Sequence, residues 1–189
     1  MAMFFTLAPF GTFAALTMLS TVQISLAASA AVAFAVFGWD VVRGRSVKML
    51  ATGAFVLFAA LLAYHQVADK ALSPTEVRIA VDCGMLTIAL TSLAIRFPFT
   101  LQYAREAVEP EIHQQPRFIR TSYILTWVWS GAIALMLIAD IVAVYWPSIP
   151  VWTCAAIVFA ARNSASLFTQ WYPKKVMALV AAEISTKPA

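Results

Sequence analysis

Long apolar runs alternate with short polar joints along almost the whole chain. A helix needs about 20 apolar residues to cross the roughly 30 Å hydrocarbon core of a bilayer. Backbone polar groups in hydrocarbon must bond within their own segment, so such runs fold as helices. The pattern predicts an all-α, polytopic membrane helical bundle, a single integral membrane domain over residues 1–189. The six expected transmembrane helices cover residues 4–19, 24–42, 49–67, 77–95, 118–145 and 151–171.

The first two runs leave the number of helices open. Residues 4–42 form either a hairpin of two spans, or a short re-entrant piece and one span, which gives five spans in total. A third reading is a cleaved signal peptide, because Ala28-Ser29-Ala30 resembles a small-residue cleavage site. The first 30 residues contain no Lys or Arg, so the basic region that begins a signal peptide is missing.

The composition agrees with a membrane domain and argues against other classes of protein. Hydrophobic residues make up 62% of the chain and charged residues 12%, whereas soluble domains carry about 25% charged residues. The net charge of +4 predicts contact with the anionic headgroups of a lipid bilayer. The basic residues are spread over separate joints without interleaved aromatic residues, so we expect no binding of nucleic acid.

The distribution of Lys and Arg predicts the orientation of the chain. Short loops rich in Lys and Arg stay in the cytoplasm. In the six-span layout, the joints on one side carry only Lys70 and Arg78. The other side carries ten basic residues: Arg43, Arg45, Lys48, Arg96, Arg105, Arg117, Arg120, Lys174, Lys175 and Lys187. We therefore expect both termini in the cytoplasm, an assignment that depends on an even number of spans.

The longest joint, residues 97–117, contains a segment with helical periodicity between Pro98 and Pro110. Its apolar residues repeat at helical spacing on one face, and its charges take the opposite face. We expect a short amphipathic helix in the membrane interface, with aromatic side chains dipping into the headgroup boundary. The residues of this interfacial helix are Phe99, Leu101, Tyr103, Arg105 and Glu106. It acts as a tether between spans, as a docking surface for a partner, or as a catalytic loop.

Three ionisable residues, Asp82, Asp140 and Arg162, are candidates for function within the predicted spans. Charged groups are costly in hydrocarbon, and they usually face the bundle interior or a water-filled cavity. The structural interpretation pairs Asp82 with Arg78, four residues earlier on one helix face. It gives Asp140 a hydrogen bond to Ser, Thr or Trp on a neighbouring span, and lets Arg162 snorkel toward the cytoplasmic headgroups or bond to carbonyl groups of the span. The functional interpretation places an aspartate and Arg162 in one polar cavity, as a proton or ion relay.

The chain lacks the motifs of common catalytic and metal sites, since no CxxC, HExxH, GxSxG or P-loop pattern occurs. His65 and His113 fall on opposite sides of the predicted membrane, so they do not share a metal. Cys83 and Cys154 are expected to be free thiols. We therefore expect no catalytic residues, no metal and no cofactor, and we interpret the protein as non-enzymatic.

Several features of the layout are shared with one known family. They are Leu7 to Phe10 in a short first span, a basic joint ending at Lys48-Met49, the exit Arg96-Phe97-Pro98, and Pro116-Arg117-Phe118 opening a Trp-rich span. In these features, over residues 7–175, the chain resembles the intracellular septation protein A family of bacterial inner-membrane proteins. The resemblance implies a role in cell-envelope maintenance or septation, carried out through other inner-membrane or division proteins. It implies no catalytic residues.

Two other classes of function stay open beside this interpretation. A small transporter or channel would line a polar cavity with Asp82, Asp140 or Arg162. A membrane enzyme, or an accessory subunit of a larger complex, would need a cofactor or a partner surface.

Overall fold

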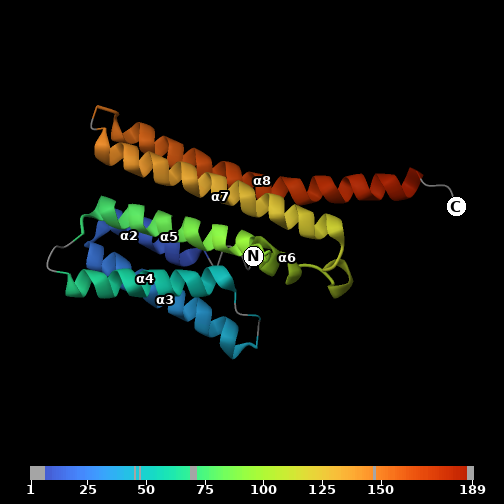
Figure 1. Ribbon diagram of the computed structural model, residues 1–189, viewed down its shortest axis with the longest axis horizontal. Helices are drawn as coiled ribbons and strands as arrows, with labels where there is room; N and C mark the ends of the chain where they lie inside the picture. The colour runs from blue at the N-terminus through green and yellow to red at the C-terminus, as the bar shows by residue number, and fades with distance from the viewer. Residues whose placement is uncertain (1–6, 45, 47, 69–71, 147, 187–189) are drawn as a thin grey trace.

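The computed structural model describes residues 7–44, 46, 48–68, 72–146 and 148–186, with side chains up to residue 180. Within these residues the fold is entirely helical, without a β-strand (Figure 1). The helices are α2 (Ala8–Leu19), α3 (Val22–Val42), α4 (Met49–Val67), α5 (Pro74–Ala94), α6 (Phe99–Arg105), the 3₁₀ turn η1 (Pro110–Ile112), α7 (Pro116–Tyr145) and α8 (Val151–Thr186).

Five of these helices, α3, α4, α5, α7 and α8, are long and apolar enough to cross a membrane. The expectation of an all-helical, multi-pass membrane domain is confirmed at that level. The first helix, α2, has 12 residues and extends roughly 18 Å at about 1.5 Å per residue. This length is shorter than the hydrocarbon core. Residues 4–6 of the first expected span lie outside the described residues.

Each long helix packs mainly against its neighbours in the chain. The principal contacts join α2 with α3, α3 with α4, α4 with α5, α5 with α7, and α7 with α8. Helices α7 and α8 form a hairpin along one side of the bundle, and α8 continues past the other helices (Figure 1). Because α7 is its one principal neighbour among the described elements, α8 leaves most of its circumference exposed.

The alternating direction of the helices gives the bundle two ends, and we name each after a charged residue found there. At the Lys48 end α3 and α5 end, while α4 and α7 begin. At the Arg78 end α4 and α7 end, while α5 and α8 begin. The short helix α6 connects α5 to α7 at the Lys48 end.

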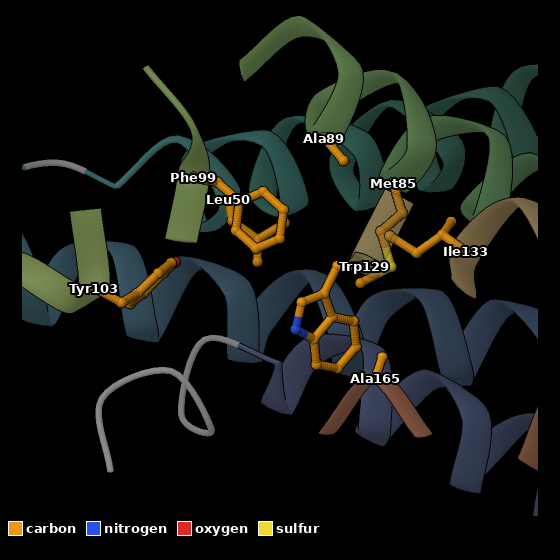
Figure 2. Packing of buried hydrophobic residues seen from close by; sticks show 8 residues of the cluster. All are labelled: Leu50, Met85, Ala89, Phe99, Tyr103, Trp129, Ile133 and Ala165. Carbon is orange, nitrogen blue, oxygen red and sulfur yellow. The ribbon is translucent and has the colours of Figure 1, made fainter. Parts of the chain in front are cut away.

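One apolar core unites α4, α5, α6, α7 and α8, and Figure 2 shows its side chains. Between membrane helices such packing contributes mainly van der Waals attraction, because lipid tails are as apolar as leucine. Trp129 is buried in this core, and its indole Nε1 donates a hydrogen bond to Thr169 Oγ1 at 2.9 Å. Trp127 is 60% exposed, because two residues on a helix are separated by about 200°. The core residues are Leu50, Met85, Ala89, Phe99, Tyr103, Trp129, Ile133 and Ala165.

Two glycines allow α4 and α5 to approach closely. A Cβ on Gly53 of α4 would lie 2.6 Å from Ile88 Cδ1 of α5. A Cβ on Gly84 of α5 would overlap Leu57 Cδ1 of α4. Each helix therefore places a branched side chain against a glycine of the other, in the manner of small residues at membrane helix contacts.

The two ends of α5 are closed by local hydrogen bonds. At the start, Ser73 and Glu76 form a capping box, in which Ser73 N–H donates to Glu76 Oε2 at 2.7 Å, as the Ser-Pro-Thr-Glu sequence predicts. At the other end Arg96 has φ 59°. Its N–H donates to Leu93 O, and Phe97 N–H donates to Ser92 O, both at 3.0 Å. This is a Schellman closure with arginine at the position that glycine usually takes.

The structure differs from the sequence expectations at two helices. The helix of the last expected span, 151–171, does not end with that span, because α8 continues through Pro173 to Thr186. A proline removes one backbone hydrogen bond and bends a helix without forbidding its continuation. The helix expected between Pro98 and Pro110 exists as α6, but it is only seven residues long.

The side chains of α6 also point differently from the expectation. Phe99, Leu101 and Tyr103 are buried against protein, so the expectation that Phe99 and Tyr103 dip into the headgroup boundary is wrong. A helix of seven residues has too small an apolar face to fix its orientation at a membrane surface. Contacts of α6 with α4 and α7 set its orientation instead. Arg105 stacks over Phe97, with its Cζ 5.3 Å from the ring centroid.

Candidate functional site: two buried charge clusters

A salt bridge between α5 and α7 organises the Arg78 end. Arg78 lies in the second turn of α5 and Asp140 lies near the end of α7. The Arg78 Nη2 atom donates to Asp140 Oδ1 at 2.5 Å. The Asp140 side chain is 5% exposed and the Arg78 side chain is 40% exposed. The cation therefore reaches the surface, while the carboxylate that it binds is enclosed by helices.

Asp82 completes the Arg78 cluster, one turn further along α5 from Arg78. It is 9% exposed and lies within the electrostatic influence of both Asp140 and Arg78. Among the hydrogen bonds and salt bridges of the described residues, none involves Asp82. The cluster thus contains one cation and two carboxylates, of which one carboxylate holds the cation directly.

The expected pair of Asp82 with Arg78 is not formed, since Arg78 binds Asp140 instead. An acidic residue four positions before a basic one pairs well on a helix, and the reverse order, found here, pairs less well. Asp140 approaches from a different helix and is free of this constraint. The expected hydrogen bond of Asp140 to Ser, Thr or Trp is not among those of the described residues; its partner on the neighbouring helix is Arg78.

Arg162 does not join the two aspartates. It lies on α8, is exposed, and takes part in none of the hydrogen bonds or ion pairs found among the described side chains. The predicted polar cavity shared by Arg162 and an aspartate is therefore not formed, and the arginine that meets an aspartate is Arg78. The structure brings Asp82 and Asp140 together and leaves Arg162 apart.

The Lys48 end contains a second cluster, which the sequence reasoning missed. Lys48, just before α4, has a side chain only 2% exposed. Its Nζ atom binds Asp40 Oδ2 of α3 at 3.0 Å and Glu106 Oε1, just after α6, at 3.2 Å. The same Nζ lies 5.4 Å from the centroid of the Tyr103 ring. A buried ammonium group needs such partners, because desolvation of an isolated charge is costly.

Polar side chains attach α6 to the surrounding helices at the Lys48 end. Gln102 Oε1 accepts a hydrogen bond of 2.7 Å from Met49 N–H, one of the free backbone donors at the start of α4. Thr100 Oγ1 donates to Ser122 O of α7 at 2.6 Å. Thr100 Oγ1 also lies 2.7 Å from Thr126 Oγ1, and since its own proton is used, Thr126 is the donor. The joint between α5 and α7 is thus built into the bundle.

His113 binds backbone carbonyl groups in the segment between α6 and α7. Its Nε2 lies 2.9 Å from Arg105 O and 3.2 Å from Val108 O. Carbonyl oxygens only accept hydrogen bonds, so Nε2 carries the proton and donates. Its ring stacks on Phe118, with centroids 6.2 Å apart. In the described residues, no group of three His, Cys, Asp or Glu side chains is arranged to hold a metal ion.

The sequence contained a signal for the Lys48 cluster. Asp40 lies in the last turn of the expected span 24–42, so it is an ionisable residue inside an apolar run, like Asp82. Lys48 follows eight residues later, at the start of the next expected span, and the antiparallel packing of the two consecutive helices brings the side chains together. The contribution of Glu106 had no local signal, because it depends on how α6 packs.

A groove of about 490 Å³ lies between α7 and α8. Small and apolar side chains line it, including Gly131, Leu135, Ala160, Ser164 and Phe168. None of Asp82, Asp140 and Arg162 is among the lining residues. No charged residue is among those that line the groove between α7 and α8.

Comparison with known proteins finds no matching protein family, no matching curated protein and no matching solved structure.

Proposed function

We propose that this chain is a non-enzymatic membrane protein that acts by binding other membrane proteins, with α8 as a principal binding element. The observation that carries this proposal is the exposed polar sequence Arg162-Asn163-Ser164 on α8. A polar surface at bilayer depth is costly when it faces lipid. A protein partner that covers this surface removes the cost.

The depth of this polar sequence follows from the aromatic residues of α8. Trp152 and Trp171 are both exposed, and tryptophans concentrate at the two membrane interfaces. Their separation of 19 residues corresponds to roughly 28 Å along a helix, close to the thickness of the hydrocarbon core. Lys175 Nζ lies 4.8 Å from the Trp171 ring, which suits a charged boundary there. Arg162 is then near the middle of the bilayer.

The orientation that we propose places the Lys48 end and both termini in the cytoplasm of a bacterial inner membrane. The bias of ten basic residues toward that side supports it. With α2 as a sixth, short transmembrane element, the N-terminus shares the side of the C-terminus. Labelling of single cysteines at positions 70 and 187 in intact cells tests this topology. A reagent confined to the periplasm should modify position 70 only. Modification of position 187 by this reagent would show that the orientation is opposite to the one we propose.

The cellular role that we propose is maintenance of the cell envelope or septation. The resemblance in layout to the intracellular septation protein A family supports it. Deletion of the chain in its native host should lengthen cells or increase envelope permeability, and the wild-type chain should restore both. Normal cell length and permeability after deletion would reject this role, whatever α8 binds.

Photo-crosslinking tests the binding role of α8 directly. A photoreactive phenylalanine at Phe159, one turn before Arg162, should yield discrete protein adducts in the native host. Phe34 of α3 provides a matched control, since it is also an exposed phenylalanine on a predominantly apolar helix, and it should yield lipid adducts. Lipid adducts alone at both positions would reject the proposed function.

A second function, proton or ion translocation, is favoured by the arrangement of Asp82. This carboxylate is buried, lies beside the Arg78–Asp140 pair, and has no direct ionic partner among the described residues. A carboxylate in this situation can gain or lose a proton while the neighbouring pair holds the helices together. In proteoliposomes loaded with a pH-sensitive dye, translocation would be present in the wild type and lost in Asp82→Asn. Absence of flux in the wild type would eliminate this alternative.

A further inference from the structure

Arg162 is a charged group in mid-span, and the part of the chain that the structure describes provides no counter-ion for it. Arginine remains protonated under all conditions that proteins encounter, so burial in lipid cannot be relieved by loss of a proton. The chain has nine carboxylate side chains. The structure describes seven of them, and none of these seven forms an ion pair with Arg162. Of the other two, Asp69 follows α4 in sequence. Glu183 lies 21 residues beyond Arg162 on the same helix, roughly 31 Å away.

Snorkelling does not solve the problem of Arg162. Helical side chains lean toward the N-terminus of their helix, which for α8 is the Arg78 end. An extended arginine reaches roughly 7 Å, whereas the nearer interface is roughly 14 Å away along the helix, given about 1.5 Å per residue. The guanidinium group therefore stays within the hydrocarbon region, where lipid phosphates are out of reach without thinning the bilayer.

The surroundings of Arg162 on α8 suit contact with another helix. Ala155, Phe159, Arg162 and Ser166 follow each other at spacings of four, three and four residues. This spacing forms one stripe along a helix, as in left-handed helix pairs. The first three of these side chains are exposed and Ser166 is half-buried. The small residues at both ends of the stripe allow a second backbone to approach, which brings its side chains within reach of the guanidinium.

We propose that Arg162 binds the carboxylate of an Asp or Glu in mid-span on a transmembrane helix of a different membrane protein. This inference rests on the proposed function and specifies the chemistry of the partner. The planar guanidinium fits a carboxylate with two parallel hydrogen bonds, and the pair neutralises both charges in the membrane. A second copy of the chain offers no such group, because Asp40, Asp82 and Asp140 are buried within its own bundle.

Binding of designed transmembrane peptides to the full chain in phosphatidylcholine vesicles tests the proposal. The peptide is a Leu–Ala helix with tryptophan at both ends and Glu at its centre, and the control peptide has Gln there. Energy transfer between a dye on the C-terminus of the chain and a dye on the peptide reports association. We expect the Glu peptide to bind the wild type about tenfold more tightly than the Gln peptide, as for a charged hydrogen bond.

Substitutions in the chain identify the contact. Arg162→Gln should abolish the preference for Glu over Gln and leave the weak binding of the Gln peptide unchanged. Ala155→Leu should weaken binding of the Glu peptide by blocking the stripe. Ala156→Leu, the same change at the next exposed residue and about 100° away around the helix, should leave binding unchanged.

Two outcomes would overturn the proposal. Equal affinity of the wild type for the Glu and Gln peptides would exclude carboxylate recognition. Energy transfer between two labelled copies of the chain that is lost in Arg162→Gln would assign Arg162 to self-association instead. If either result were combined with protein adducts at Phe159 in cells, partner binding would stand and only the chemistry assigned to Arg162 would fail.

Discussion

The two charge clusters contain the same groups, one cation and two carboxylates, in opposite arrangements. At the Lys48 end the cation is buried, and both carboxylates bind it directly. At the Arg78 end the cation is 40% exposed and binds Asp140, while Asp82 is buried beside the pair. Lys48, at the start of α4, has partners from two other segments, α3 and α6 with its C-cap, whereas Arg78 joins only α5 to α7. The comparison indicates that the Lys48 cluster connects α3, the start of α4 and α6, whereas the Arg78 cluster leaves one buried carboxylate without an ion pair among the described residues.

The largest effect should come from removing the buried cation. We expect Lys48→Met to lower the free energy of unfolding by about 3–5 kcal/mol, because it leaves the buried Asp40 without its counter-ion, while the Glu106 side chain, 26% exposed, can turn to water. Unfolding in mixed detergent micelles measures the change. The triple variant Asp40→Asn, Lys48→Met and Glu106→Gln removes all three charges and should recover most of the stability. Lys174→Met, at an exposed lysine, is the control, and an equal loss there would remove the distinction between buried and exposed lysines.

At the Arg78 end the loss of the bonded carboxylate should cost less. Asp140→Asn should lower the free energy of unfolding by about 1–3 kcal/mol, as for a hydrogen bond between charged groups, since the half-exposed Arg78 can turn to water. A double-mutant cycle with Arg78→Gln should show a coupling of similar size. Additive effects in the cycle would mean that the salt bridge between α5 and α7 contributes nothing to stability.

The closure at the Lys48 end contains a strained residue whose replacement should be favourable. Arg96 has φ 59°, a conformation that costs a non-glycine residue about 1 kcal/mol. Arg96→Gly should raise the free energy of unfolding by up to that amount, because glycine adopts this φ freely. Arg43→Gly is the control, since Arg43 has φ −84° and gains nothing from glycine. A loss of stability in Arg96→Gly would show that the arginine side chain contributes more to the free energy of unfolding than the strain at this φ costs.

The smallest stability effect should come from the carboxylate without an ionic partner. Asp82→Asn removes one of two neighbouring negative charges and breaks no hydrogen bond or ion pair among the described residues. We expect the detergent melting temperature to stay unchanged or rise slightly, in contrast to Asp140→Asn. A fall as large as that of Asp140→Asn would place Asp82 among the structural groups, and the difference between the two ends would then disappear.

The sequence predicted the long elements and missed the contacts between them. The span 49–67 coincides with α4, because a long apolar run in a membrane has no alternative to a helix. The Ser73 capping box and the stop at Arg96 were also readable, since both depend on neighbours within a few residues.

Side-chain partners were less predictable, because they depend on which helices become neighbours. The pairing of Arg78 with Asp140 joins residues 62 positions apart, and no local pattern indicates it. The orientation of α6 was missed for the same reason, since Gln102 and Thr100 bind α4 and α7. For Arg162, its presence within an apolar run was readable, but its separation from both aspartates required the three-dimensional arrangement.

The long separation between Arg78 and Asp140 has a consequence for synthesis of the protein. Helices that pack on their neighbours in the chain can assemble as they leave the ribosome, and Lys48 finds Asp40 already made. Arg78 must wait for 62 further residues, roughly 3–12 s at about 5–20 residues per second. During that delay Asp82, one turn further along α5, is a carboxylate within reach of Arg78 on the same helix. An arrest-peptide force profile should therefore show a later step in Asp82→Asn, with Asp82 acting as a temporary counter-ion that the finished bundle releases.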